Sequence, residues 1–201
     1  MRVLGIFGSP RRGGNTDLLL EEALKGAAQK GARVEGVHLC DLKIAPCREC
    51  LSCFKDGACV IPDDMQRIYP LLLEADVVIL ASPIFFYGIT GWAKAMVDRC
   101  QALWARKYVL HDPALETKDK QRWGFFISVG GTKGQRVFEG AILTVKYFFD
   151  AFSVAYRGEL LFRGIDASGD ILQNPEALPQ ALAAGRKLII GDSVLPAEDN
   201  S

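Results

Sequence analysis

The stretch Val3-Leu-Gly-Ile-Phe-Gly-Ser-Pro-Arg-Arg-Gly-Gly-Asn-Thr16 joins a short apolar run to a glycine-rich turn. The apolar run up to Gly8 is continuous, which is typical of a strand buried on both faces of a sheet. Asn15 or Thr16 can cap a helix that continues to about Lys30, because short polar side chains accept the first free N–H groups of a helix. A buried strand, a turn and a helix in this order predict an α/β fold.

Strand and helix patterns alternate along the rest of the chain, without an internal repeat or an interdomain linker. The clearest buried strand is Asp76-Val-Val-Ile-Leu-Ala-Ser82. The other strands are expected over 33–39, 123–129 and 152–161, and the other helices over 63–74, 92–106, 138–150 and 175–191. Five strands, with an anion-binding turn after the first, favour a parallel sheet in the order 2-1-3-4-5 with helices on both faces, a three-layer sandwich. We therefore expect one domain over residues 1–192 and a C-terminal tail over 193–201.

The composition limits the class of partner. The chain has 201 residues, 49% of them hydrophobic, a formal net charge of zero and a pI near 6.7. A neutral chain without a basic patch is not expected to bind nucleic acid. No apolar run reaches the roughly 18 residues of a membrane span, and Arg2 followed by a short strand is unlike a signal peptide. Together with the cysteine content, these features predict a protein of the reducing cytoplasm with no membrane association.

Four of the six cysteines lie in Cys47-Arg-Glu-Cys-Leu-Ser-Cys-Phe-Lys-Asp-Gly-Ala-Cys59, with the spacing C-x2-C-x2-C-x5-C. Three thiols at this spacing on a curled loop converge on one point, and Cys59 can close the cage from the far side. This arrangement suits a [4Fe-4S] cluster, in which each iron is held by one thiolate. Zinc is an alternative, although its cysteines usually come from two separate knuckles, and unligated thiols are another. The loop over 44–62 is too long for a plain connection and is predicted to be functional.

Three loops are expected to meet at the carboxyl edge of the sheet, where the strand order reverses: residues 8–16, 82–90 and 129–135. The first of them precedes a helix start, where backbone N–H groups and the helix dipole favour an anion. Its sequence matches neither G-x-x-x-x-G-K-[ST] nor G-x-G-x-x-G, which argues against ATP, GTP or a dinucleotide held in the usual Rossmann way. A terminal phosphate monoester, as on FMN, fits better, with Arg11 and Arg12 supplying positive charge.

The second loop, Pro83-Ile-Phe-Phe-Tyr-Gly88, carries three aromatic residues at the expected crevice, which suit the wall of a planar ring. The third loop has accessible backbone at Gly130 and Gly131 and can reach the polar edge of that ring. Neither loop contributes a nucleophile or a base, and His38 and His111 are expected to be a strand residue and a surface residue. A site this poor in acid–base groups favours redox chemistry carried by a cofactor.

These motifs, together with Asp63-Asp64-Met65, resemble those of the iron-sulfur flavoproteins, in the NADPH-dependent FMN reductase branch of the flavodoxin-like superfamily. The resemblance covers roughly residues 1–160, and the cysteine loop is its most specific part. It implies a flavodoxin-like fold, FMN as prosthetic group, a [4Fe-4S] cluster beside it, and a homodimer or homotetramer. It also implies electron transfer from a ferredoxin-like donor, and we expect the final acceptor to be small, such as a quinone, oxygen or peroxide.

Carried over residue by residue, the resemblance assigns ligands for both cofactors and no catalytic acid or base. The FMN phosphate would be held by Ser9, Arg11, Asn15 and Thr16. The isoalloxazine ring would be held by Pro83, Ile84, Phe85, Tyr87, Gly88, Ser128, Gly130 and Gly131. The cluster would be ligated by Cys47, Cys50, Cys53 and Cys59. The remaining cysteines, Cys40 and Cys100, are expected to be small buried residues.

Two other functions are compatible with these residues. One is an NAD(P)H-dependent FMN or quinone reductase with a structural or unoccupied cysteine loop; NAD(P)H would then be the electron donor, although the sequence contains no recognisable nicotinamide site. The other is a non-enzymatic flavodoxin-like carrier with zinc in the loop.

Two further expectations concern arrangement. The segment 104–120, with Trp104, Tyr108 and Val109, is too apolar for a simple loop and predicts an oligomer whose subunits jointly shelter the flavin. The cysteine loop leaves the carboxyl end of the second strand and is therefore expected to emerge at the same edge as the flavin loops, in its own subunit or facing a neighbour's.

Overall fold

The computed structural model describes residues 1–116 and 121–190, so the expected tail over 193–201 lies outside the described residues. Its strands form a parallel sheet in the order β2-β1-β3-β4-β5. Their bounds are Arg2–Phe7 for β1, Arg33–His38 for β2, Val77–Ala81 for β3, Trp123–Gly130 for β4 and Ala155–Arg163 for β5. The predicted order is confirmed, and it is the order of flavodoxin-like folds.

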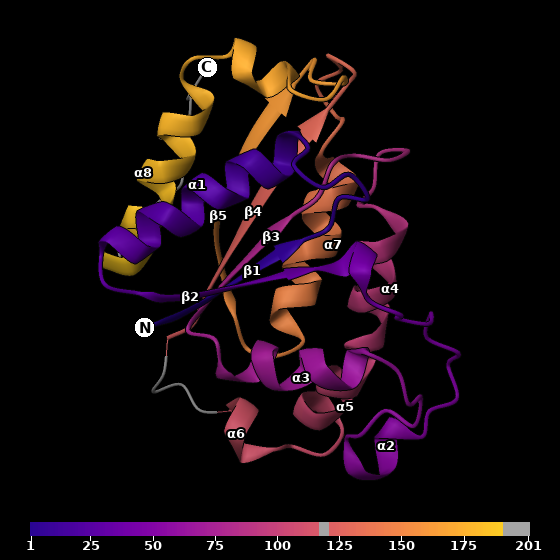
Figure 1. Cartoon of the computed structure of the whole chain (residues 1–201). Helices are drawn as coiled ribbons and strands as arrows, with labels where there is room; N and C mark the ends of the chain where they lie inside the picture. The colour runs from indigo at the N-terminus through magenta and orange to yellow at the C-terminus, as the bar shows by residue number, and fades with distance from the viewer. Residues whose placement is uncertain (117–120, 191–201) are drawn as a thin grey trace.

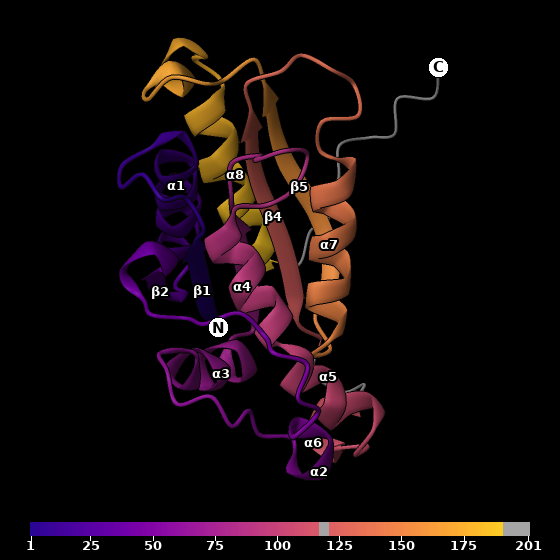
Figure 2. The same ribbon diagram turned by 90° about the vertical axis from the view of Figure 1, so that its right-hand side faces the viewer.

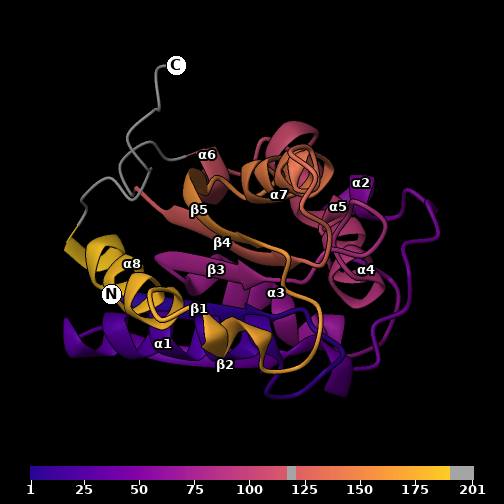
Figure 3. The same cartoon turned by 90° about the horizontal axis from the view of Figure 1, so that it is seen from above.

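Helices cover both faces of this sheet (Figure 1 and Figure 3). One face carries α1 (Asn15–Gln29) and α8 (Ala177–Ile190). The other carries α3 (Met65–Glu74), α4 (Gly91–Arg99), α5 (Gln101–Tyr108) and α7 (Glu139–Asp150). The short elements are η1 (Leu39–Asp41), α2 (Cys53–Asp56), α6 (Pro113–Glu116) and η2 (Asp170–Gln173). The three-layer sandwich is thus confirmed, and none of the helices over 1–116 and 121–190 is long and apolar enough to span a bilayer.

The two central strands, β3 and β4, are buried along their whole length, as their continuous apolar sequences predict. Alternate side chains of β3 point to opposite faces. Val78 and Leu80 join the cluster under α3, α4 and α7, whereas Val77 and Ile79 join the cluster under α1 and α8. The hydrophobic core therefore consists of two layers on either side of one sheet.

Helices α1 and α8 approach each other so closely that only glycine fits at two positions. A Cβ atom built on Gly185 would lie 1.8 Å from the carbonyl oxygen of Ala23, and one built on Gly26 would lie 2.1 Å from that of Leu182. Backbone-to-backbone packing of this kind holds the layer that covers the start of the chain.

Two elements differ from the sequence-based expectation. The single helix expected over 92–106 is two helices, α4 and α5, which meet at Cys100. No glycine or proline marks this break, so the apolar spacing looks continuous. The last strand begins at Ala155 and not at residue 152, because Phe152 is fully buried in a turn whose next residue, Ser153, has a φ of 60°.

Candidate functional site

The loops at the carboxyl edge of the sheet enclose a small pocket of about 80 Å³, called here the edge pocket. Eight of the twelve predicted flavin ligands line it: Ser9, Arg11, Asn15, Thr16, Pro83, Ile84, Phe85 and Gly131. These residues come from the loops after β1, β3 and β4, so the three predicted loops do meet at one place. The edge rule for parallel sheets correctly predicted that these loops meet.

The start of α1 has uncapped backbone N–H groups that favour the binding of an anion. Its N-cap is Gly14, which offers no side-chain cap, so the first backbone N–H groups of the helix are not satisfied from within the cap. The hydroxyl oxygen of Ser9 accepts the Arg11 N–H at 3.0 Å and shapes the turn. Arg11 lines the pocket, whereas Arg12 forms an ion pair with Asp41. The donors therefore fit a phosphate group, with Arg11 as the cation that faces it.

The side chain of Asn15 forms hydrogen bonds with the turn after β5, a partner that the sequence did not indicate. Its side-chain N–H donates to the carbonyl oxygen of Ala167 at 2.8 Å, and its Oδ1 accepts the N–H groups of Gly169 (3.0 Å) and Ile171 (3.2 Å). The side chain is buried, with 7% exposed. Asn15 thus ties the turn after β5 to the start of α1, in addition to lining the pocket.

This turn contributes pocket residues that sequence reasoning missed. Asp166 and Ser168 both line the edge pocket. A Cβ on Gly131 would lie 3.1 Å from a carboxylate oxygen of Asp166, so the turn packs directly on the loop after β4. The sequence could have indicated this turn, because the carboxyl end of a fifth parallel strand must reach the same edge of the sheet as the other four.

The aromatic loop is a tight hairpin. Phe85 and Gly88 exchange two backbone hydrogen bonds, of 2.9 and 3.0 Å. The two residues between them, Phe86 and Tyr87, have φ values of 49° and 63°, as a type I′ turn requires. Bulky residues rarely adopt this conformation, and strain of this kind is concentrated at functional sites. Phe85 lines the pocket, but Phe86 and Tyr87 project into solvent.

Four predicted flavin ligands do not line the edge pocket: Tyr87, Gly88, Ser128 and Gly130. Ser128 is fully buried and donates its hydroxyl to the carbonyl oxygen of Ser82 at 2.7 Å, which joins β4 to the end of β3. The carbonyl oxygen of Gly130 accepts the Ile165 N–H at 3.1 Å. These two residues hold the strand ends beneath the pocket.

A buried acid lies beneath the anion-binding loop. Asp17 is 1% exposed and accepts the Gly13 N–H at 3.0 Å. Burial raises the pKa of Asp17 to about 6. His38 Nδ1 lies 3.9 Å from its carboxylate, and the His38 ring stacks on Phe7 with centroids 4.0 Å apart. The expectation of His38 as a strand residue is confirmed.

A second cavity, of about 460 Å³, is lined by all four cysteines of the motif and is called here the cysteine cavity. Its other walls include Arg99 from α4 and Ala102 and Trp104 from α5. Cys47 and Cys50 are exposed, whereas Cys53 and Cys59 are half-buried. All four motif cysteines thus line the same cavity.

The backbone around Cys50 is tightly curled. Glu49 and Leu51, on either side of it, have φ values of 51° and 55°, which non-glycine residues seldom adopt. The Glu49 N–H points to the sulfur of Cys47 at 3.5 Å. Backbone that alternates between right-handed and left-handed conformations forms concave nests of N–H groups, and such nests occur at many phosphate and iron–sulfur sites.

The far side of the loop is held by α2 and α5. Helix α2 ends at Gly57, whose φ is 77°, and a Cβ there would lie 2.3 Å from the Cγ of Arg106. The ring of Phe54 lies 6.0 Å from that of Trp104, centroid to centroid. Both a left-handed backbone and a close approach therefore require glycine at this position.

The four thiols influence one another. Burial raises the pKa of Cys53, and the charges of Cys59, Cys47 and Cys50 raise it further. By contrast, hydrogen bonding from Ser52 lowers the pKa of Cys50. Within the described ranges, no three His, Cys, Asp or Glu side chains are grouped closely enough to hold a metal ion.

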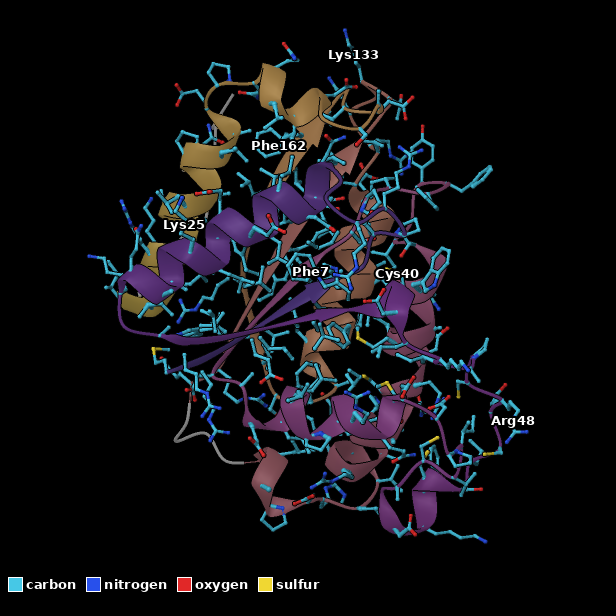
Figure 4. All side chains as sticks on the ribbon, viewed as in Figure 1. Phe7, Lys25, Cys40, Arg48, Lys133 and Phe162 are labelled. Atoms are coloured by element: carbon cyan, nitrogen blue, oxygen red, sulfur yellow. The ribbon has the colours of Figure 1, made fainter. Side chains whose placement is uncertain are left out.

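The two cavities lie at opposite ends of α4. At its start, the Thr90 hydroxyl caps the helix and donates to the carbonyl oxygen of Gly8 at 2.5 Å, beside the edge pocket. At its end, Arg99 lines the cysteine cavity. The nine residues of α4 span about 13 Å. Figure 2 shows α2 beside α5, far from the loops after β4 and β5, and Figure 4 shows Lys133 and Arg48 at distant ends of the molecule.

The expectation that the cysteine loop emerges beside the flavin loops therefore fails within one subunit. The loop leaves β2 at the carboxyl edge but continues to the far end of α4, because Arg99 and α5 bind it there. Of the two cysteines outside the motif, Cys100 is buried as expected, but Cys40 is half-exposed.

Comparison with known proteins shows the family to which the chain belongs. Residues 1–156 match the family model described as NADPH-dependent FMN reductase. The chain belongs to this family. The NADPH-dependent FMN reductase match ends close to the start of β5, so the turn over 164–171 that Asn15 binds lies beyond it.

Members of the family with similar sequences include iron-sulfur flavoproteins. One, from Methanocaldococcus jannaschii, is 43% identical over 103 residues, which cover 51% of this chain and 53% of that protein. A second from the same organism is 36% identical over 152 residues, 74% of this chain and 71% of that protein. The chain thus spans about half the length of the first relative. The NAD(P)H:quinone oxidoreductase from Methanothermobacter marburgensis has the same fold, with a TM-score of 0.68, 16% identity and coverage of 94% of this chain and 96% of that one.

Proposed function

We propose that this protein is an FMN-dependent oxidoreductase of the iron-sulfur flavoprotein type, with one FMN and one [4Fe-4S] cluster per chain. The observation that carries this proposal is the presence of two separate cavities with complementary chemistry. One offers an uncapped helix start and an arginine, and the other offers four thiols from one motif. Family membership supports the flavin, and the similar iron-sulfur flavoproteins support the cluster.

The FMN phosphate would be bound by the backbone N–H groups at the start of α1, with Ser9, Arg11 and Thr16 around them. Pro83 and Phe85 would flank the ring system. When bound, FMN exchanges one or two electrons, and the chain's own residues bind it, orient it and exclude water from one side. The turn over 8–16 lacks the G-x-G-x-x-G pattern of dinucleotide sites, so FMN is expected rather than FAD.

The cluster would be ligated by Cys47, Cys50, Cys53 and Cys59. A structural zinc site usually draws its cysteines from two separate knuckles, whereas these four cysteines come from one short motif and line one cavity. The carrier function with zinc is therefore less well supported than the cluster. The exposed thiols Cys47 and Cys50 would oxidise in an oxidising compartment, which supports the reducing cytoplasm as location.

We further propose that a ferredoxin-like donor supplies electrons through the cluster, and that FMN passes them to a small acceptor. Support comes from the exposure of Cys47 and Cys50, which leaves the cysteine cavity accessible to a redox partner. The separation of the two cavities by α4 favours transfer between subunits over transfer within one.

A homodimer or homotetramer is part of this proposal. The side chains of Trp104, Tyr108, Leu143 and Tyr147, on α5 and α7, are exposed by 37%, 43%, 58% and 71%. A groove between these helices connects three of them. A cluster of large apolar side chains of this kind is typical of a surface covered by another protein, here a second copy of the chain.

The proposal is tested by anaerobic purification, analysis of iron, sulfide and released flavin, and two cysteine variants. Cys50→Ser should lose the cluster and reduction by ferredoxin, yet keep FMN that dithionite bleaches. The matched control is Cys40→Ser, which lies outside the motif and should behave like the parent. Recovery of FAD, or parent-rate reduction of Cys50→Ser by ferredoxin, would contradict the proposal.

The alternative, an NAD(P)H-dependent FMN or quinone reductase, is favoured by the family description. Stopped-flow mixing of the anaerobic protein with NAD(P)H distinguishes the two. Fast flavin reduction that is unchanged in Cys50→Ser would support direct reduction by the nicotinamide.

A further inference from the structure

A buried arginine lies between the cysteine cavity and the core. Arg99 is the last residue of α4, and its side chain is 0% exposed. Its Nη1 donates to the carboxylate of Asp63 at 2.6 Å and to the carbonyl oxygen of Ala45 at 3.0 Å. Its Nη2 donates to the other carboxylate oxygen of Asp63 at 3.1 Å and to the carbonyl oxygen of Ile61 at 3.3 Å. The guanidinium is thus held in a fixed orientation.

The groups that Arg99 binds are the two ends of the cysteine loop. Ala45 lies two residues before the first motif cysteine, and Ile61 lies two residues after the last. Asp63 strengthens the same closure, because its carboxylate also accepts the Ala45 N–H at 2.8 Å and the Met65 N–H at 3.1 Å. The Asp63–Arg99 pair therefore fixes the distance between the points where the loop leaves and rejoins the domain.

A buried ion pair is a weak source of stability, because removing two charges from water offsets much of their attraction. An apolar pair could close a loop at lower cost. A planar, permanently charged donor is favoured where a further acceptor must be bound in a fixed direction.

One atom of this side chain has no partner. Among the described residues, the Nε–H of Arg99 is buried and makes no hydrogen bond. Arg99 lines the cysteine cavity together with all four motif thiols. Burial lowers the pKa of Arg99, but hydrogen bonding with Asp63 and with Cys59 raises it overall, so the Cys59 thiol is within reach of the guanidinium. The side chain that carries the unused donor is therefore part of the wall of the cavity proposed for the cluster.

We propose that Arg99 is a positioning residue for the [4Fe-4S] cluster, closing the cysteine loop through Asp63 and donating its Nε–H to a sulfur on the Cys59 side of the cluster. This inference rests on the proposed function of the cysteine cavity. A cation and an N–H donor next to the sulfur favour the more negative, reduced form, so Arg99 raises the reduction potential of the cluster.

The test uses anaerobically prepared holoprotein with FMN and cluster. Arg99→Lys keeps the charge but lacks the fork and the Nε–H, and Arg99→Met removes both. The matched control is Arg106→Lys, because Arg106 is also ion-paired, with Asp112, and packs next to Gly57 without lining the cavity. FMN content reports whether each variant has folded.

Two readouts are independent of turnover: the half-life of the cluster in the presence of an iron chelator, and its midpoint potential from an EPR-monitored titration. Both Arg99 variants should lose iron about 10–100-fold faster than the parent, as expected for loss of an outer-shell partner. Arg99→Lys should also show a lower cluster potential with an unchanged FMN potential, which a merely structural role would not produce. Arg106→Lys should match the parent in both.

If Arg99→Met binds no FMN and does not fold, Arg99→Lys decides the result. Parent-like half-life and potential in Arg99→Lys would overturn the inference while leaving the proposed function intact. If the parent itself takes up no iron and sulfide, the proposed function fails, and this inference fails with it.

Discussion

Asn15 has two possible roles: it could bind the flavin phosphate, or it could hold the turn after β5 in place at the pocket wall. Replacing Asn15 with alanine distinguishes the two roles. The Asn15 side chain makes three hydrogen bonds to the backbone of the turn after β5. Alanine would leave the N–H groups of Gly169 and Ile171 without their acceptor. The Ala167 carbonyl oxygen would keep only the Asp170 N–H, at 3.2 Å. Because Asn15 is only 7% exposed, water replaces these bonds incompletely.

The magnitude follows from the bonds that are lost. A neutral hydrogen bond contributes about 0.5–1.5 kcal/mol, so three of them contribute about 2–4 kcal/mol to the free energy of unfolding. The effect should appear in flavin-free protein, since the turn is bound without a ligand. FMN affinity should also fall, because the turn carries the pocket residues Asp166 and Ser168.

Urea denaturation of flavin-free protein measures the first effect, and FMN titration followed by fluorescence measures the second. Arg11→Ala is the comparison, because Arg11 is exposed and lines the pocket. It should weaken FMN by about 1.5–3 kcal/mol, the value of a charge-assisted hydrogen bond, with little change in unfolding. If Asn15→Ala instead weakens FMN and leaves the unfolding free energy unchanged, Asn15 is a ligand and the tether argument is wrong.

Three further outcomes are expected. Gly185→Ala should lower the unfolding free energy by about 1–3 kcal/mol, because its methyl group would lie 1.8 Å from the carbonyl oxygen of Ala23. Gly91→Ala is the control, because its methyl group would contact no other atom within 4 Å. Equal unfolding free energies of the two variants in urea would contradict this prediction. The pKa of Asp17 is raised to about 6 from 3.8, so the folded state binds the proton more tightly and stability decreases as pH rises through that range. Relative to Asp17→Asn, flavin-free parent should lose about 2 kcal/mol between pH 4 and pH 7, and a pH-independent difference would refute the assignment. Tyr147→Glu, on the exposed face of α7, should reduce the oligomer measured by light scattering, and a parent that is already monomeric at micromolar concentration would remove the oligomer proposal.

Much of the fold could be predicted because its signals are local. The apolar run of β3 indicates a strand buried on both faces, and the turn after β1 indicates an anion site at a helix start. The rule that ligands bind at the carboxyl edge then brought three distant loops together correctly. The break between α4 and α5 could not be predicted, since neither Gly nor Pro marks Cys100.

The two candidate sites also depend on contacts that no local sequence pattern indicates. Asn15 has the residue type of a phosphate ligand or a helix cap, and nothing near it in sequence indicates that its partners are Ala167, Gly169 and Ile171. Arg99 looks like an ordinary charged residue at a helix end. Its burial against Asp63 depends on how α4 packs beside the cysteine loop.

The sequence by itself therefore determined the alternation of strands with helical segments, the strand order and the identity of the chemical groups: four thiols in one motif and a glycine-rich turn at a helix start. These features follow from the periodicity of apolar residues and from short-range spacing, and such local patterns have the same effect wherever the element lies in the fold. Only the tertiary structure decided that the two groups of predicted ligands line separate cavities at opposite ends of α4, a helix about 13 Å long. That separation arises from packing between residues far apart in the chain, and no local pattern encodes the distance between two packed elements.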